Sequence, residues 1–377
     1  MQTPRSIGRI LAVLALISTN SKKTSNDTFI LPIHLKILLQ YDSTPIQRNY
    51  HSMDKHYFRS DPQLNNALEE VNHLINQRIT VNNTDLQAAL KQMASKGGKY
   101  LRPAFCLTFA RLGGKNSWNS SKLIKIASSL EILHMATLIH DDVIDDSPER
   151  RGAPSIQKAF GKDTAVYSGD LLFTVFFDLL VETMESSPYL ATNAQAMRKI
   201  LVGELGQMNQ RYQQQSLLEY YRNINGKTAT LFSLAAQEGA HFGGADARTV
   251  HLAKHIGQNI GITFQILDDM LDYTTNKKLN KPILEDLATG VYSLPLLLVL
   301  KEHDKELDPY LAKKQEMTVE DTQEVQRLVN QYGGVKQAHE LAGKFTNKAL
   351  QLIDELPTSP TQKLLKKVTI QLLDRSM

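Results

Sequence analysis

Apolar residues recur at three- and four-residue spacing along most of the chain after Asp61, which is the pattern of amphipathic helices. Alternating strand patterns are essentially absent. Several segments are apolar nearly all round, so we expect an all-α fold, a large single-domain helical bundle whose central helices are covered on every side. The spacing predicts helices over residues 64–79, 84–96, 120–142, 164–184, 196–214, 227–243, 247–273, 293–303 and 322–356, with a break at Gly333–Gly334.

Residues 1–55 lack this sustained periodicity, and we interpret them as a poorly ordered N-terminal extension before a helical domain at 56–377. Arg5 and Arg9 precede the apolar run ILAVLALIS, which faintly resembles a signal peptide. The run is too short to span a bilayer, and no convincing cleavage site follows it. An extension, or translated sequence upstream of a start at Met53, is therefore favoured over export or anchoring.

The composition is that of an ordinary soluble globular protein, with 42% hydrophobic and 22% charged residues in 377. The net charge of +4 comes from 43 basic and 39 acidic residues without long blocks of one sign, which gives no support for nucleic-acid binding. The single cysteine, Cys106, excludes an intramolecular disulfide and favours a reducing, cytoplasmic location. Its apolar surroundings, PAFCLTFA, indicate a core residue rather than a nucleophile.

Two acidic clusters interrupt the apolar pattern, HDDVIDD at 140–146 and LDDMLD at 267–272. Each contains the spacing D-D-x-x-D at the polar end of an apolar helix, and the first and last aspartates of such a run share a face. Crowded carboxylates repel one another unless a cation lies between them, and Mg²⁺ is the natural choice where phosphate is the other ligand. One such cluster is common on a solvated surface; two in apolar segments favour a function. The candidate metal ligands are Asp141, Asp142, Asp145, Asp268, Asp269 and Asp272.

Two arginines, Arg150 and Arg151, follow the first acidic cluster directly. Such a pair is suited to gripping phosphate oxygens. Acidic metal sites beside a double arginine indicate a diphosphate ligand.

Six segments carry a resemblance to a known family: GGKYLRP at 97–103, LEILHMATLIHDDVIDDSPERRG at 130–152, GDLL at 169–172, GKTATLF at 226–232, FQILDDMLDYT at 264–274 and NKPILEDLATGVYSLPLL at 280–297. In type and order they resemble the trans-isoprenyl (polyprenyl) diphosphate synthases, from about residue 60 to the C-terminus. The resemblance implies a helical bundle of the isoprenoid synthase type with a central active-site cavity. It also implies a Mg²⁺-dependent prenyltransferase, with about three ions per site, that condenses isopentenyl diphosphate with an allylic diphosphate such as farnesyl or geranylgeranyl diphosphate.

The resemblance assigns a role to each matching residue. Asp141 and Asp145, with Asp142 supporting, would hold Mg²⁺ on the allylic diphosphate, and the second cluster would hold a further ion from the opposite wall. Residues expected to bind the allylic diphosphate are Arg150, Lys227, Thr228, Gln265 and Lys281. Those expected to bind isopentenyl diphosphate are Lys99, Arg102, His134 and Arg151. The catalytic set is Asp141, Asp145, Asp268, Asp269 and Lys227.

Several of these roles have a structural alternative. A histidine in an apolar run, such as His134, is more often a hydrogen-bonded core residue. Lys99 and Arg102 can cap a helix, although the preceding Gly97–Gly98 favours backbone that approaches an anion. Lys227 alone would read as a solvated lysine at a helix start.

The chain departs from the family pattern at two positions. Asn280 replaces the usual glycine before Lys281, and Thr275 replaces another common glycine, which puts the geometry of Lys281 in question. We leave Asp146 off the metal-binding face. We assign Glu149, His140 and Asp286 supporting or structural positions.

Product length should depend on what lies beneath the first metal site. Ala136 and Thr137, five and four residues before Asp141, are small where short-chain members of the family carry bulky aromatics. They favour a product longer than C20, of about C30–C50, as in quinone side chains. Candidates for a floor to this space are Leu133, one turn deeper, and Phe173, Phe176 or Phe177, which can equally be ordinary core.

Other interpretations remain open. A terpene cyclase would lack the isopentenyl-binding set and usually one acidic motif, and a non-catalytic subunit would have lost aspartates that are complete here. A farnesyl or geranylgeranyl diphosphate synthase, and the catalytic subunit of a heterodimer, are further alternatives. The family expectation is a homodimer, with at most peripheral membrane contact.

Overall fold

The computed structural model describes Phe58 and residues 61–95, 100–114, 118–274 and 284–374, and within these ranges the all-α prediction is confirmed. The predicted extension at 1–55, Lys99, Asn280, Lys281 and Thr275 lie outside the described residues. The elements are α3 (Pro62–Arg78), α4 (Thr84–Ser95), α5 (Leu101–Ala110), η1 (Arg111–Gly113), α6 (Ser121–Ile144), β1 (Glu149–Arg150), β2 (Ala153–Pro154), α7 (Ile156–Phe160), α8 (Lys162–Met184), α9 (Tyr189–Asn209), α10 (Leu217–Ile224), η2 (Asn225–Ala229), α11 (Thr230–Gly243), α12 (Ala247–Leu271), α13 (Glu285–Ala288), α14 (Leu294–Leu311), η3 (Lys314–Glu316), α15 (Val319–Gln331), α16 (Gly334–Asp354) and α17 (Pro360–Asp374).

Helices α3 and α12 begin at residues whose side chains cap the first turn, and α15 ends before a glycine in the left-handed conformation. Asp61 caps α3, with its side chain accepting a hydrogen bond from the Leu64 amide at 3.0 Å, and Asp246 caps α12 in the same way. The predicted break at Gly333–Gly334 is confirmed, because Gly333 adopts a φ of 75° that ends α15 before α16 begins. The helix predicted to stop at residue 303 continues to Leu311 as α14, with a kink at His303.

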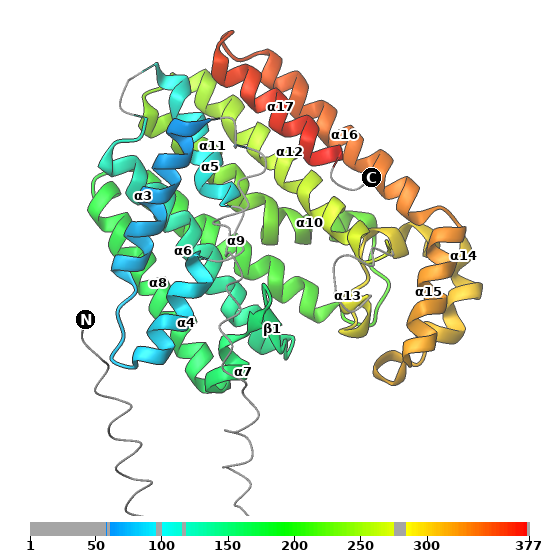
Figure 1. Ribbon diagram of the computed structural model, residues 1–377. Helices are drawn as coiled ribbons and strands as arrows, with labels where there is room; N and C mark the ends of the chain where they lie inside the picture. The colour runs from blue at the N-terminus through cyan, green and yellow to red at the C-terminus, as the bar shows by residue number, and fades with distance from the viewer. Residues whose placement is uncertain (1–57, 59–60, 96–99, 115–117, 275–283, 375–377) are drawn as a thin grey trace, which may run out of the picture. The chain divides into compact units, whose positions relative to one another are not determined.

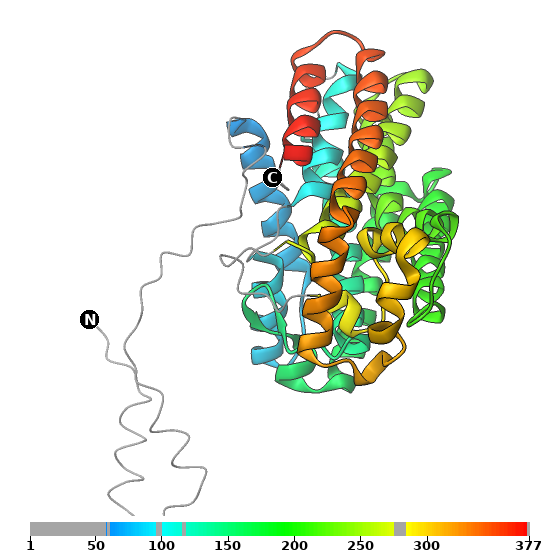
Figure 2. The same cartoon turned by 90° about the vertical axis from the view of Figure 1, so that its right-hand side faces the viewer.

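Helix α6 is the central element and packs against α8, α5, α3 and α11. Helix α12 packs against α11 on one side and α16 on the other. Figures 1 and 2 show α16 and α17 running side by side along one flank, with α14 and α15 next to each other beyond them. The core forms two apolar clusters, one around α3, α5, α6, α8 and α11 and one around the end of α12 with α14, α15 and α16.

Helices α6 and α8 both have the length and hydropathy of a membrane span. In the described fold they pack against each other, and 72% of the most apolar window of α6 is buried inside the bundle. The equivalent window of α8 is only 39% buried. The apolarity of α6 is thus accounted for by its central position, whereas α8 leaves apolar surface uncovered.

Helices α5 and α11 approach closely where α11 carries a glycine, which has no side chain. A Cβ atom on Gly239 of α11 would lie 2.0 Å from the carbonyl oxygen of Cys106 in α5. Cys106 is fully buried at this contact, which confirms the prediction of a core position. Helix α5 itself was not predicted from periodicity, because nearly all its residues are buried and its sequence shows no polar face.

Glu238 is a fully buried carboxyl in α11. Its Oε1 accepts a hydrogen bond from the Nδ2 atom of Asn193 in α9, and its Oε2 has no partner. Burial raises the pKa of Glu238 from 4.5 to about 8, and the Asn193 hydrogen bond offsets only part of that rise. The carboxyl is therefore neutral over most of the physiological pH range.

We expect Glu238 to make the stability of the fold fall as pH rises. Its pKa is higher in the folded than in the unfolded chain, so its contribution is complete below about pH 4.5 and is lost progressively up to about pH 8. The slope is at most ~1.4 kcal/mol per pH unit. Urea unfolding of Glu238→Gln should remove this slope, and exposed Glu185→Gln is the matched control. An identical pH profile for wild type and Glu238→Gln would contradict the assignment.

Candidate active site

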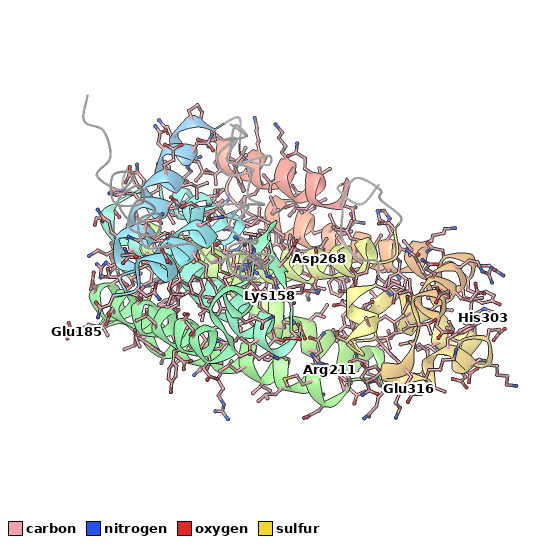
Figure 3. The ribbon with its side chains drawn as sticks, turned by 60° about the horizontal axis from the view of Figure 1, so that its bottom comes forward. Lys158, Glu185, Arg211, Asp268, His303 and Glu316 are labelled. Atoms are coloured by element: carbon pink, nitrogen blue, oxygen red, sulfur yellow. The ribbon has the colours of Figure 1, made fainter. Side chains whose placement is uncertain are left out.

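A cleft of about 450 Å³ opens between the C-terminal ends of α6 and α12 and the elements that face them, α9 and η2. In Figure 3, Asp268 from α12 lies near the middle of the view and Arg211, from the segment after α9, lies below it, whereas Glu185 and His303 lie toward the two ends. The predicted site residues that line the cleft are Arg102, His134, Thr137, Asp141, Asp145, Arg150, Lys227, Thr228, Gln265, Asp268 and Asp272.

Both acidic clusters lie at the C-terminal end of a helix, where the helix macrodipole is negative. Asp145 is the C-cap of α6 and Asp272 is the C-cap of α12, and neither helix carries a basic residue in its last turn. The carboxylates therefore stand in an unfavourable field, which only cations from elsewhere can offset.

The second aspartate of each D-D-x-x-D run is buried and is not among the residues that line the cleft. Asp142 is 2% exposed and binds Arg150, with 2.8 Å between Nε and Oδ1. Asp269 is 4% exposed and accepts hydrogen bonds from the Tyr220 hydroxyl at 2.8 Å and the Leu294 amide at 3.1 Å. One step along a helix is a rotation of about 100°, so the first and last aspartates face the cleft and the second faces the bundle. Metal binding by Asp142 and Asp269 stays a prediction.

Basic side chains from other segments lie against the first cluster. The Nη2 atom of Arg211 is 2.5 Å from Oδ1 of Asp145. The negative charge of Asp141 acts on Lys227, whose Nζ atom lies 2.9 Å from Oε2 of Glu204. Within the described ranges, no three carboxylate, imidazole or thiol side chains are already grouped as a metal site. The carboxylates of the first cluster are instead held by the chain's own cations.

The π-helical turn η2 presents Lys227 to the cleft. Its backbone packs tightly on α9, because a Cβ atom on Gly203 would lie 2.7 Å from the Lys227 nitrogen. Burial alone would lower the pKa of Lys227, but Asp141 and Glu204 outweigh it and raise that pKa. Burial also raises the pKa of Glu204 to about 7, against the pull of Lys227. The negative charge of nearby carboxylates, Asp141 among them, contributes to the raised pKa values of both Lys227 and Glu204, because it favours the protonated form of each group.

The wall formed by α12 holds a second group of carboxylates. Asp268 and Asp272 line the cleft, and the Asp286 amide donates to Oδ2 of Asp272 at 3.4 Å. Burial raises the pKa of Asp286 well above its ordinary value, and Asp272 and Asp269 raise it further. Burial likewise raises the pKa of Asp269 to about 6. Asp286, for which the sequence favours a supporting or structural position, lines the cleft with the predicted ligands.

Arg102 of α5 and His134 of α6 also line the cleft, and His134 precedes Asp141 by seven residues, about 10 Å along the helix. The Arg102 guanidinium lies 5.0 Å from the centre of the Phe232 ring, and its buried Nε atom has no hydrogen-bond partner. Burial lowers the pKa of Arg102 to about 10, so it remains a cation at neutral pH. Burial, reinforced by Arg102, lowers the pKa of His134 well below its ordinary value, so this imidazole is neutral. A buried cation with an unused donor is suited to an anionic ligand.

Some predicted residues are not among those that line the cleft, although the charge of Arg151 acts on both Arg102 and His134. Arg151 is exposed and does not line the cleft. Ala136 and Leu133 are fully buried and do not line it either. Lys99 and Lys281 lie outside the described residues.

Thr137 is the one predicted chain-length residue that lines the cleft, and Phe264 of α12 lines it as well. Of the three phenylalanines considered as a floor, Phe173 stacks on His140, Phe176 is fully buried, and Phe177 is 42% exposed. They do not line the cleft. The phenylalanine that lines the cleft therefore comes from α12 rather than from α8.

Five residues of the site were missed or undervalued from sequence: Glu204, Gln207, Arg211, Tyr220 and Asp286. The first three are polar positions at three- and four-residue spacing, which places them along one side of α9 and its continuation. That spacing was a usable signal. Tyr220 and Asp286 carry no comparable signal, because their contacts are with distant segments.

Comparison with known proteins identifies the family of the chain. Residues 83–332 match the family described as polyprenyl synthetase. Component 2 of heptaprenyl diphosphate synthase from Geobacillus stearothermophilus is 33% identical over 75% of this chain and 88% of its own length. The all-trans-nonaprenyl-diphosphate synthase (geranyl-diphosphate specific) of Rhodobacter capsulatus is 32% identical over 81% and 94%.

Solved structures give the same result. Geranylgeranyl pyrophosphate synthase from Lactobacillus brevis ATCC 367 has a TM-score of 0.81 and 40% identity, covering 85% of this chain and all (100%) of that one. Heptaprenyl diphosphate synthase from Staphylococcus aureus has a TM-score of 0.78 and 31% identity, covering 83% and 99%. The fold, the sequence and the site together show that this chain belongs to the polyprenyl synthetase family and is a prenyltransferase.

Proposed function

We propose that this chain is a long-chain trans-polyprenyl diphosphate synthase, which joins isopentenyl diphosphate to an allylic diphosphate primer, farnesyl or geranylgeranyl diphosphate. The observation that carries the proposal is the composition of one cleft. Carboxylates from α6 and α12 line one part of it, and Arg102 with neutral His134 lines another. Such a cleft offers separate places for two diphosphates, as condensation of two such substrates requires.

The donor set fits Mg²⁺, because Asp141, Asp145, Asp268 and Asp272 offer hard oxygen ligands from two walls. Magnesium, at about three ions per site, would stabilise the negative charge of the departing diphosphate. Lys227, beside Glu204 and Gln207, is placed to bind oxygens of the same diphosphate.

The remaining lining orients the substrates and excludes water. Thr228 donates to Gln265 at 2.6 Å, and Gln265 donates to Asp269 at 2.9 Å, which fixes the amide that faces the primer. Thr137 and Phe264 supply less polar lining next to the acidic end. A water-poor wall there would protect a carbocation formed when the primer ionises.

Small size at Thr137 supports a product of about C30–C50, as do relatives that include hepta-, octa- and nonaprenyl diphosphate synthases. The second candidate is a geranylgeranyl diphosphate synthase. It is favoured by the similarity to the Lactobacillus brevis enzyme at 40% identity. A long product would serve as a quinone side chain. We propose that the enzyme itself is cytoplasmic. A tagged chain should then appear in the soluble fraction of lysed cells, and its recovery with the membranes would contradict this location.

We propose that the subunit pairs with a second copy through an apolar patch on α8 and α9. Its exposed members are Val166, Phe177, Val181, Leu201, Val202, Leu205 and Met208. The two helices contact each other, so one continuous surface can meet its own copy about a two-fold axis. The relative named component 2 makes a different partner subunit the alternative.

The pure chain, without any partner, should condense isopentenyl diphosphate with farnesyl diphosphate when Mg²⁺ is present. Asp141→Ala and Asp268→Ala should each lower kcat/KM by about 10²–10³-fold or more, because each removes a cleft-facing carboxylate. Circular dichroism should show both variants folded, and exposed Asp304→Ala is the control. Near-normal turnover in either variant would refute the metal assignment, and inactivity of the pure wild type would favour an obligate partner.

Thr137→Phe should shorten the product, because it places a ring on the lined face of α6 one turn below Asp141. Ala136→Phe should instead destabilise the fold by about 1–3 kcal/mol, since Ala136 is fully buried outside the lining. Reversed-phase chromatography of dephosphorylated products and thermal unfolding separate the two effects. Unchanged product length in Thr137→Phe would contradict the assignment.

Leu205→Glu should convert a dimer into a monomer, because it buries a charge in the proposed interface. Light scattering after size exclusion should give twice 42.4 kDa for the wild type and 42.4 kDa for the variant. Leu218→Glu is the control, since Leu218 is 69% exposed on α10 and outside the patch. A monomeric wild type would overturn the proposal.

A further inference from the structure

Arg211 and Tyr212, the second and third residues after α9, connect the two walls of the cleft. Tyr212 donates from its amide to the Gly290 carbonyl at 2.7 Å and from its hydroxyl to the Ala288 carbonyl at 3.1 Å. Its neighbour Arg211 binds Asp145, on the opposite acidic cluster, at 2.5 Å. Residues 211–212 therefore lie between the end of α6 and the segment after α13.

This link is held in a specific conformation. Tyr212 has a φ of 57°, which is costly for a residue with a side chain and is maintained only when its surroundings fix it. The fixing contact is close, because a Cβ atom on Gly290 would lie 2.6 Å from the Tyr212 ring. Arg211 is thus aimed at Asp145 by backbone that is anchored on the other wall.

The carboxylate paired with Arg211 is more accessible to an entering cation than the carboxylate paired with Arg150. Arg150 binds Asp142, which is 2% exposed and turned into the bundle. Arg211 binds Asp145, whose side chain is 36% exposed and lines the cleft. A cation that enters the cleft therefore competes with Arg211 for Oδ1 of Asp145, whereas the Asp142–Arg150 pair involves a carboxylate that does not line the cleft. The buried Nε atom of Arg211 has no partner, so this guanidinium keeps an unused donor.

We propose that Arg211 is the counter-ion of Asp145 in the metal-free enzyme and moves to a diphosphate oxygen when a divalent cation takes Asp145. The inference rests on the proposed function, because the anion that receives Arg211 is the diphosphate of the primer. The exchange prevents the crowded carboxylates from repelling one another before the substrate arrives. It also delivers a fork of donors to an anion that binds beside the cation.

The first test is the affinity of the substrate-free enzyme for Mn²⁺, used as the probe and followed by the electron paramagnetic resonance of the free ion. Arg211→Gln should bind Mn²⁺ about two- to five-fold more tightly than the wild type, because a competing, partly exposed ion pair is lost. Arg222→Gln, which removes the same charge from an exposed position on α10 outside the cleft lining, should bind it as the wild type does.

The second test is steady-state kinetics. Arg211→Gln should raise the KM for the allylic diphosphate about tenfold and leave the KM for isopentenyl diphosphate unchanged, and Arg211→Lys should recover part of the loss. Mn²⁺ affinity that is unchanged or weaker in Arg211→Gln would overturn the proposal, as would equal tightening in Arg222→Gln. An unchanged KM for the primer would do the same.

The two tests separate this proposal from the proposed function. The Mn²⁺ titration uses no prenyl substrate, so its result decides the role of Arg211 at Asp145 even if the wild type transfers no prenyl group. If Arg211→Gln does not fold, Arg211→Lys keeps the question open to measurement. A lysine makes a single contact instead of a fork of contacts, so it should compete with the cation less well than arginine does. Arg211→Lys should therefore bind Mn²⁺ more tightly than the wild type, by a smaller factor than Arg211→Gln.

Discussion

The electrostatic cost of placing carboxylates at the negative ends of two helices governs the design of this protein. Helices α6 and α12 each end in a D-D-x-x-D run with no basic residue in the last turn. Neither helix could end there stably if these groups were left uncompensated in a partly buried cleft. For the first cluster the compensating cations come from other elements: Arg150 from β1, Arg211 from the segment after α9, and Lys227 from η2.

The same constraint explains why the packing around the cleft is so close. Lys227 meets Glu204 only because α9 and η2 approach at Gly203, where a side chain would meet the Lys227 backbone. Tyr212 reaches the segment after α13 only because Gly290 has no side chain. These glycines set the distance between charged groups, so they contribute to the electrostatics of the site as well as to its backbone geometry.

Much of the fold and part of the site could be predicted from sequence. Periodicity predicted the long helices, and the D-D-x-x-D spacing predicted that Asp141 and Asp145 share a face. It could not show that Asp142 and Asp269 face the bundle, because that depends on which neighbour covers each helix. Ala136 and Thr137 were weighted equally for a related reason: adjacent positions differ by about 100°, and only the packing shows which of them lines the cleft.

The balance of charge in the cleft shows what it can bind. Six carboxylates, Asp141, Asp145, Glu204, Asp268, Asp272 and Asp286, line it against three basic side chains, Arg102, Arg150 and Lys227. The excess is three negative charges, which the upward pKa shifts of Glu204 and Asp286 relieve in part. A bound diphosphate adds further negative charge. The chain's lining cations cannot neutralise that sum, so tight binding of a diphosphate here requires several additional positive charges, and divalent cations supply them in the smallest volume.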